Sequence, residues 1–196
     1  IGATHAGISV GEDGASHQCN EDIALMRTIP GMVIINPSDD VEAKAAVKAA
    51  YEHYGPVYLR FGRLAAPVIN DTPDYKFELG KGVTVREGKD ITIVATGLEV
   101  GFAIEAAKML EADGIDARVI NIHTIKPLDE DIIVKAATET KKIFTVEEHS
   151  IIGGLGSAVC DVVCEKCPVP VYKIGMRDKF GESGPALELL HKYELD

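Results

Sequence analysis

Two hydrophobic periods alternate along the second half of the chain. Apolar runs at 90–95, 117–122, 142–146 and 169–174 have the length of buried strands. Between them, apolar residues recur at the i, i+3, i+4 spacing of amphipathic helices. The buried face of the first such helix is predicted to comprise Val100, Ala103, Ile104, Ala107 and Leu110. This alternation predicts a doubly wound, mostly parallel α/β domain.

The remaining segments of this half complete the predicted alternation. Two further helices are expected near 129–138 and 155–166. A short strand at 84–86 precedes the turn residues Gly88 and Lys89. Because the strand at 90–95 follows this turn directly, the pattern predicts a hairpin between the two strands.

The first half of the chain carries fewer elements. A short helix is predicted at 21–27, and apolar runs at 32–35 and 57–61 predict two strands. A helix is expected to start at 37–40, because Asp39 followed by Glu42 has the spacing of a capping box. Its buried face is predicted to be Ala43, Ala46, Val47, Ala50, Tyr51 and Tyr54.

Prolines and polar residues between the two halves mark a domain boundary. Pro67 and Pro73 interrupt a stretch that lacks either hydrophobic period. We therefore assign 1–70 to a first domain, 71–80 to a linker and 81–196 to a second domain. At 196 residues the chain is long enough for one large or two small domains, each with its own core.

Composition narrows the classes of partner. The net charge of −11 opposes association with nucleic acids or anionic membranes. No apolar run approaches the roughly 18 residues that a membrane span requires. The four cysteines lack the regular spacing of a disulfide framework, so we expect a cytoplasmic protein. Cys160, Cys164 and Cys167 lie close together, but without a fourth ligand at zinc-finger spacing we predict free thiols and no metal.

The most informative polar residues lie near the start of the chain. His5, Asp13 and His17 surround a glycine-rich loop at 11–18. Imidazoles transfer protons near neutral pH, a carboxylate can hold a hydroxyl group, and glycines allow the backbone to approach a ligand. These residues suit a small polyhydroxylated substrate. The alternative, a simple turn with two surface histidines, fits the spacing equally well.

The segment Thr4–Ala43, which reads THAGISVGEDGASHQCNEDIALMRTIPGMVIINPSDDVEA, resembles the pyrimidine-binding domain of transketolases. Further landmarks of that family are matched at 56–63, 124–129, 146–149, 153–157 and 178–184. The resemblance therefore spans the chain and is closest to the C-terminal subunit of split transketolases. The chain is shorter than such a subunit and starts at Ile1 without a methionine, so we expect a fragment.

The resemblance implies roles for individual residues. His5 and His17 match histidines that line the substrate channel over the thiamine ring and are the expected catalytic residues. Asp13 matches the aspartate that recognises a substrate hydroxyl. Arg60 matches the arginine that holds the substrate phosphate, and Arg63 is a weaker candidate for that contact, since an exposed linker arginine is the simpler interpretation.

The resemblance also implies an activity: transfer of a two-carbon ketol unit between sugar phosphates of the pentose phosphate pathway, with thiamine diphosphate and a divalent cation, Mg²⁺ or Ca²⁺. The family's activating glutamate and aromatic pyrimidine clasp lie upstream of Ile1, and no Gly-Asp-Gly motif occurs here. We therefore expect no cofactor-binding or metal-binding residue in this chain. Alone it should be inactive, with either an N-terminal subunit or a missing N-terminal part of the same chain completing the site. The expected assembly is a homo-oligomer, a dimer.

Three alternatives remain open at this stage. Two are related thiamine enzymes, 1-deoxyxylulose-5-phosphate synthase and the 2-oxoacid dehydrogenase E1 β subunit. The third is a non-catalytic anion-binding or assembly module, because a fold does not determine a function. The glycine-rich segment 153–157 is interpreted as a tight turn rather than a nucleotide site, because it lacks the full dinucleotide-binding pattern.

Overall fold

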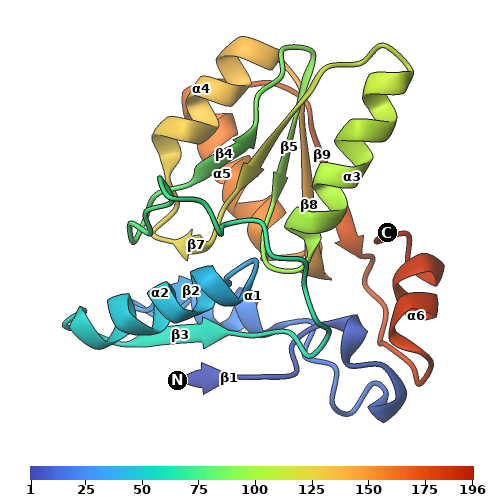
Figure 1. Cartoon of the computed structure of the whole chain (residues 1–196). Coiled ribbons are helices and arrows are strands. Elements are labelled where there is room, and N and C mark those ends of the chain that lie inside the picture. Colours follow the sequence, from blue (N-terminus) through green and yellow to red (C-terminus); the bar gives the residue numbers. More distant parts are fainter.

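The first of two sheets lies at the N-terminal end of the molecule. The computed structural model describes residues 1–196, and Figure 1 shows this sheet below the larger one. Its strand order is β1-β3-β2-β7. The strands β1, β2 and β3 are parallel to each other, whereas β7 pairs with β2 in the antiparallel direction. The strands span Gly2–Ala3 (β1), Val33–Ile35 (β2), Val57–Arg60 (β3) and Thr124–Lys126 (β7).

Strand β7 connects the two halves of the chain. It lies far beyond the proline-containing segment, yet it forms an edge of the N-terminal sheet. The helical elements around this sheet are a 3-10 helix η1 at Ile8–Asp13, α1 at Asp22–Arg27 and α2 at Asp40–Glu52. The domain boundaries predicted above remain predictions, because this strand makes the two units share a sheet.

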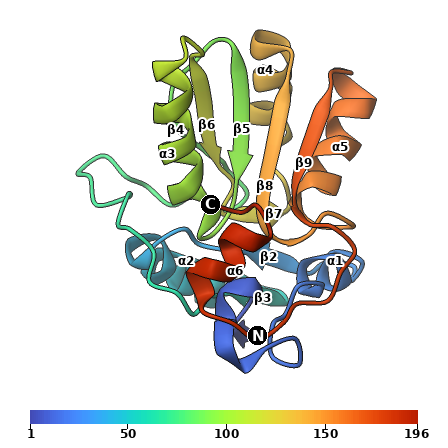
Figure 2. The ribbon, with the colours of Figure 1, turned by 90° about the vertical axis from the view of Figure 1, so that its right-hand side faces the viewer.

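The second sheet has the predicted doubly wound, mostly parallel form. Its order is β4-β6-β5-β8-β9, and only β4 is antiparallel to its neighbour. The strands span Val83–Arg86 (β4), Ile91–Ala95 (β5), Ala117–Asn121 (β6), Ile143–Ser150 (β8) and Val171–Met176 (β9). The helices α3 at Glu99–Ala112, α4 at Glu130–Thr140 and α5 at Leu155–Lys166 cover it (Figure 2), whereas α6 at Ala186–Lys192 packs against η1.

Both faces of the second sheet are buried, and its central strand is apolar at every position except Thr92, whose side chain is also buried. Successive side chains of a strand point to opposite faces. Ile93 and Ala95 pack in the cluster that contains α3, whereas Val94 packs in the cluster that contains α4 and α5. Continuous apolar runs are typical of parallel strands that are covered on both sides. The helices predicted from the hydrophobic period therefore occupy both faces, as Figure 1 shows.

Two local predictions were wrong. The hairpin between 84–86 and 90–95 does not form, because β4 pairs with β6, with Val83 opposite Asn121. The chain passes close to β6 at Gly88, where a Cβ atom would lie 2.3 Å from the carbonyl carbon of Ala117. The second error concerns the helix α2. Val47 and Tyr51 are exposed although the helical period placed them on the buried face, and Tyr54, also exposed, lies beyond the end of the helix at Glu52.

The start of α2 is fixed by Asp39. Its Oδ1 accepts the backbone N–H of Glu42 at 2.8 Å, as the capping box predicts. Its Oδ2 accepts the N–H groups of Ile69 and Asn70 at 2.8 and 2.7 Å, so the cap also holds the segment that precedes the linker. The reciprocal contact differs from the standard box, because Glu42 reaches back to Ser38.

We predict that Asp39→Ala lowers the free energy of unfolding by about 2 kcal/mol, because a buried cap and two further acceptor contacts are lost. Asp40→Ala is the matched control. Asp40 is exposed and pairs only with Lys44 one turn away, so its loss should change stability little. Urea titration of both variants measures the difference. Equal destabilisation would show that Asp39 acts only as a first-turn charge.

Candidate functional site

The loop at residues 5–18 presents both candidate histidines to solvent. His5 follows β1 with a positive φ of 62°, and His17 follows η1. Both side chains are exposed. Nδ1 of His5 shares a hydrogen bond with Thr4 Oγ1 at 2.9 Å, and Nδ1 of His17 shares one with Ser16 Oγ at 2.9 Å. Nε2 of each ring is therefore left to meet an incoming ligand.

Asp13 lies beside an arginine at the same surface. Its Oδ2 is 3.4 Å from Nη1 of Arg63, and Oε2 of Glu12 is 3.7 Å from the same atom. Arg63 also donates to the carbonyl oxygen of Val10 at 2.5 Å. The Arg63 side chain is 44% exposed, so its guanidinium retains donors for an anion. The structure thus brings Asp13 and Arg63 together, and no hydrogen bond or ion pair joins them to His5 or His17.

Arg60 is buried, whereas the resemblance implies an arginine that contacts the substrate phosphate. It ends β3, the strand between β1 and β2, and only 3% of its side chain is exposed. Nε donates to Asp22 Oδ2 at 2.8 Å. Nη2 donates to the carbonyl oxygens of Cys19 at 3.1 Å and Glu148 at 3.0 Å. The proposed phosphate contact of Arg60 remains a prediction, and in this structure its guanidinium points into the protein.

Asp22 is the anionic partner at the centre of this cluster. It also accepts the hydroxyl of Tyr58 at 2.7 Å. Burial on its own would raise the pKa of Asp22, but Arg60 and the two hydrogen bonds lower it below the ordinary value. Burial, together with the hydrogen bond to Asp22, raises the pKa of Tyr58. Sequence analysis did not find Asp22, because its partners lie more than 30 residues away in the chain.

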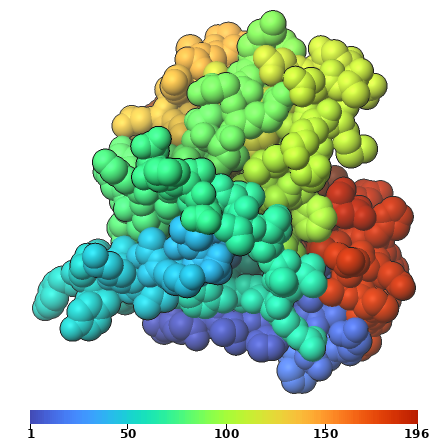
Figure 3. Space-filling model, in the orientation of Figure 1, coloured from blue at the N-terminus to red at the C-terminus, as the bar shows by residue number.

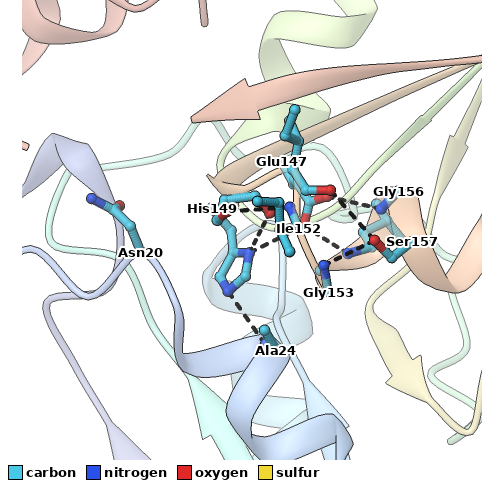
Figure 4. A network of polar contacts seen from close by, with 12 residues as sticks. Asn20, Ala24, Glu147, His149, Ile152, Gly153, Gly156 and Ser157 are labelled. Atoms are coloured by element: carbon cyan, nitrogen blue, oxygen red, sulfur yellow. Dashed lines mark hydrogen bonds and ion pairs between the residues drawn. The ribbon is translucent and has the colours of Figure 1, made fainter. Parts of the chain in front are cut away.

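A second buried cluster adjoins the first through β8 (Figure 4). Glu147 accepts the backbone N–H groups of Leu155 and Gly156 at 2.6 and 2.8 Å, at the start of α5. Burial nevertheless raises the pKa of Glu147 to about 7. Nδ1 of His149 donates to Ser150 O at 2.7 Å, and burial with the nearby Arg60 lowers the pKa of His149 to about 4.

The turn at 153–157 belongs to this second cluster rather than to a ligand site. Gly153 has a positive φ of 79°, and the N–H at that position donates to Ser157 Oγ at 2.9 Å. A Cβ atom at Gly154 would lie 2.0 Å from Glu147 Oε2. The glycines therefore let the carboxylate approach the helix start closely. This agrees with the interpretation of the segment as a tight turn.

Other candidate chemistry is sparse. No group of three or more His, Cys, Asp and Glu side chains is arranged to hold a metal ion. All four cysteines are free thiols. No helix is both long and apolar enough to cross a membrane. The exposed polar loop at 5–18 is therefore the strongest candidate functional site.

The fold is that of an α/β protein with two sheets, and the loop at 5–18 exposes the candidate polar residues. Family models described as "Transketolase, pyrimidine binding domain" and "Transketolase, C-terminal domain" match residues 1–68 and 80–196. The chain belongs to the transketolase family. The resemblance on which the sequence interpretation depends is thereby confirmed.

Individual relatives show how much of a longer protein the chain represents. It is 48% identical to a putative transketolase C-terminal section of Methanocaldococcus jannaschii, covering 100% of the chain and 62% of that protein. It is 43% identical to a 6-deoxy-6-sulfo-D-fructose transketolase subunit of a Clostridium species, covering 96% and 58%. A solved structure described as a split gene transketolase, inactive beta4 tetramer, has 51% identity and a TM-score of 0.92, covering 100% and 62%. The chain thus spans about three fifths of each.

The buried histidine makes stability depend on pH. Folding lowers the pKa of His149 from an ordinary 6.5 to about 4. Between these two pH values the imidazole is protonated in the unfolded chain and neutral in the folded chain. The stabilisation is present above pH 6.5 and lost as the pH falls towards 4. We predict that the difference in unfolding free energy between wild type and His149→Gln shrinks by roughly 3 kcal/mol over this window. Urea titrations at several pH values measure it, and a constant difference would contradict the prediction.

Proposed function

We propose that the chain is the substrate-facing part of a thiamine-dependent transketolase that transfers a two-carbon ketol unit from a ketose phosphate to an aldose phosphate. The observation that carries the proposal is the exposed loop of His5, Asp13 and His17, with Arg63 beside it. These groups suit a phosphorylated polyol, and the names of the relatives support ketol transfer. We further propose a cytoplasmic enzyme acting on sugar phosphates, assembled as a homo-oligomer with an N-terminal partner subunit.

The donor set of the loop fits the substrate and not the cofactor. Imidazoles, one carboxylate and a guanidinium can bind hydroxyl and phosphoryl oxygens, whereas a divalent cation on a diphosphate needs clustered oxygen ligands. We therefore propose that thiamine diphosphate and its Mg²⁺ or Ca²⁺ are held by residues outside this chain. When bound, the cofactor supplies the electron sink for the carbon–carbon cleavage. The chain alone is then expected to be inactive.

The residues of this chain act on the sugar. His5 and His17 each have a free Nε2 with which to hold or move a proton at a hydroxyl or carbonyl oxygen. Asp13 accepts a hydrogen bond from a sugar hydroxyl. For the phosphate, we propose Arg63 in place of Arg60, because Arg63 is half-exposed beside Asp13 and Arg60 is buried against Asp22.

The direct test is a ketol-transfer assay of the chain assembled with its N-terminal subunit, thiamine diphosphate and Mg²⁺. Xylulose 5-phosphate serves as donor and ribose 5-phosphate as acceptor. We expect a seven-carbon ketose phosphate as product, and a strong loss of turnover for His17→Ala. Condensation of pyruvate with an aldose phosphate instead would identify the synthase alternative. Activity of neither kind in the complete assembly would favour the non-catalytic module.

Substitutions of Arg63 and Arg60 should affect different quantities, namely donor binding and protein stability. Arg63→Ala should weaken phosphorylated donors by on the order of 1.5–3 kcal/mol and leave non-phosphorylated ketoses nearly unaffected, because a charged hydrogen bond is lost. Arg60→Ala should instead lower stability by about 3–5 kcal/mol, because Asp22 stays buried without its partner. KM values for both donor types and urea titrations separate these effects.

Arg86→Ala provides a matched control for the Arg63 prediction. Arg86 also has two carboxylates within 4 Å, those of Glu111 and Asp116, but it lies on β4 at the edge of the second sheet. Its loss should not change the preference between donors. If Arg60→Ala shifts that preference while stability is retained, the phosphate contact belongs to Arg60 as the sequence predicted.

A further inference from the structure

The loop at 5–18 is packed between the N-terminal sheet and the C-terminal part of the chain. We call residues 5–18 the substrate loop. Its apolar anchor is Ile8, which packs in one cluster with Met176, Leu189, Leu190 and Leu195. Helix α6 therefore lies directly against η1, and Figure 3 shows the C-terminal residues in red beside the N-terminal residues in blue. Half of the surroundings of this loop thus come from the far end of the sequence.

One carboxylate from β8 enters the loop itself. Oε1 of Glu148 accepts the backbone N–H of Ser9 at 2.5 Å, and Glu148 is only 4% exposed. Gly7 makes this approach possible. Its φ is 88°, and a Cβ atom there would lie 2.2 Å from Cδ of Glu148. Two features of the loop therefore accommodate Glu148 of the second domain. The backbone N–H of Ser9 donates to its carboxylate, and the absence of a side chain at Gly7 leaves room for it.

The backbone carbonyl of Glu148 is hydrogen-bonded as well as its side chain. Nη2 of Arg60 donates both to Glu148 O and to Cys19 O, the residue that follows the substrate loop. Burial raises the pKa of Glu148, while the Ser9 contact and the Arg60 charge oppose that rise. The buried ion pair of Arg60 and Asp22 thus fixes the position from which Glu148 reaches the loop.

A second contact holds the other end of the loop. Nε2 of Gln18 donates to the carbonyl oxygens of Ile8 and Gly11, both at 3.2 Å, and to Glu182 O at 2.8 Å. The first two acceptors lie in the loop and the third in the segment before α6. The loop therefore depends on the C-terminal domain at both ends, while Asp13 and His17 between them remain exposed.

From these contacts we infer that Glu148 is a positioning residue for the substrate loop, and that the C-terminal domain thereby sets the geometry of Asp13 and His17. Glu148 does not touch the substrate. It acts through the backbone of Ser9, which leads into η1 and Asp13. The catalytic consequence rests on the proposed function, but the structural consequence does not. Displacement of a catalytic group by about 1 Å can slow a reaction by about 10²-fold, so the effect should be measurable.

The adjacent residue Glu147 offers a matched control. Both carboxylates are buried on β8, but Glu147 accepts N–H groups of α5 and makes no contact with the substrate loop. We would compare Glu148→Ala, Glu148→Gln and Glu147→Ala in the complete two-subunit enzyme. Thermal unfolding records general destabilisation. Hydrogen exchange of peptides covering 5–18 records the loop, and the ratio of kcat to KM records the site.

Both alanine variants should lower the unfolding temperature. Only Glu148→Ala should accelerate exchange at 5–18, by about 10- to 100-fold, because one hydrogen bond to a charged group is lost there. It should also raise KM for the sugar donor more than it lowers kcat. Glu148→Gln keeps an acceptor oxygen for Ser9 and should restore most of the protection.

The outcomes separate the two proposals. If Glu147→Ala accelerates exchange in the loop as much as Glu148→Ala, or if neither does, the positioning role is wrong. If exchange responds as expected but the wild-type assembly transfers no ketol unit, the inference stands and the proposed function fails. If the loop responds and KM does not, the loop is held by Glu148 but does not bind the donor, which overturns the catalytic consequence.

Discussion

The ion pair between Arg60 and Asp22 is the interaction on which the junction of the two sheets depends. Both side chains are almost completely buried, so each would carry a large desolvation cost without the other. Tyr58 donates a further hydrogen bond to Oδ2 of Asp22, and Arg60 also donates to the carbonyl oxygens of Cys19 and Glu148, whereas Oδ1 of Asp22 has no hydrogen-bond partner. One guanidinium therefore links β3, α1, the end of the substrate loop and β8. A buried pair of this kind contributes more to geometric definition than to net stability.

Two neighbouring glutamates on β8 contact different elements at this junction. Glu147 faces the start of α5, where it accepts unpaired backbone N–H groups, a favourable position for a negative charge. Glu148 faces the opposite way and accepts the N–H of Ser9. Because successive side chains of a strand alternate, one strand can serve both the interior of its own domain and the loop of the other. The short register shift of β8 against β9 after Val146 coincides with this stretch.

The sequence predicted the second domain well because its signals are local. The strand at 90–95 and the helix at 155–166 each depend on residues within a few positions of one another, and the same holds for the cap at Asp39 in the first half of the chain. The pairing of β4 was missed because its partner, β6, lies about 35 residues away, and β7 was missed because it is only three residues long with a single apolar residue, Ile125. The exposed face of α2 shows the same limit: the helical period identifies an apolar face but not what covers it.

The candidate site shows the same division between local and distant signals. Loop composition and the resemblance singled out His5, Asp13 and His17; their side chains are exposed, and their roles stay predictions. The resemblance assigned the phosphate contact to Arg60, and an exposed arginine was the simpler interpretation of Arg63. The burial of Arg60 could not be predicted, because it depends on Asp22, which lies 38 residues away in the chain. Arg60 still lies on β3, between two other strands, on the same side as Tyr58, and so it faces Asp22. Arg63 lies beyond the last strand position, where no neighbouring strand encloses it. A difference of three residues therefore buries one arginine against Asp22 and leaves the other partly exposed at the surface.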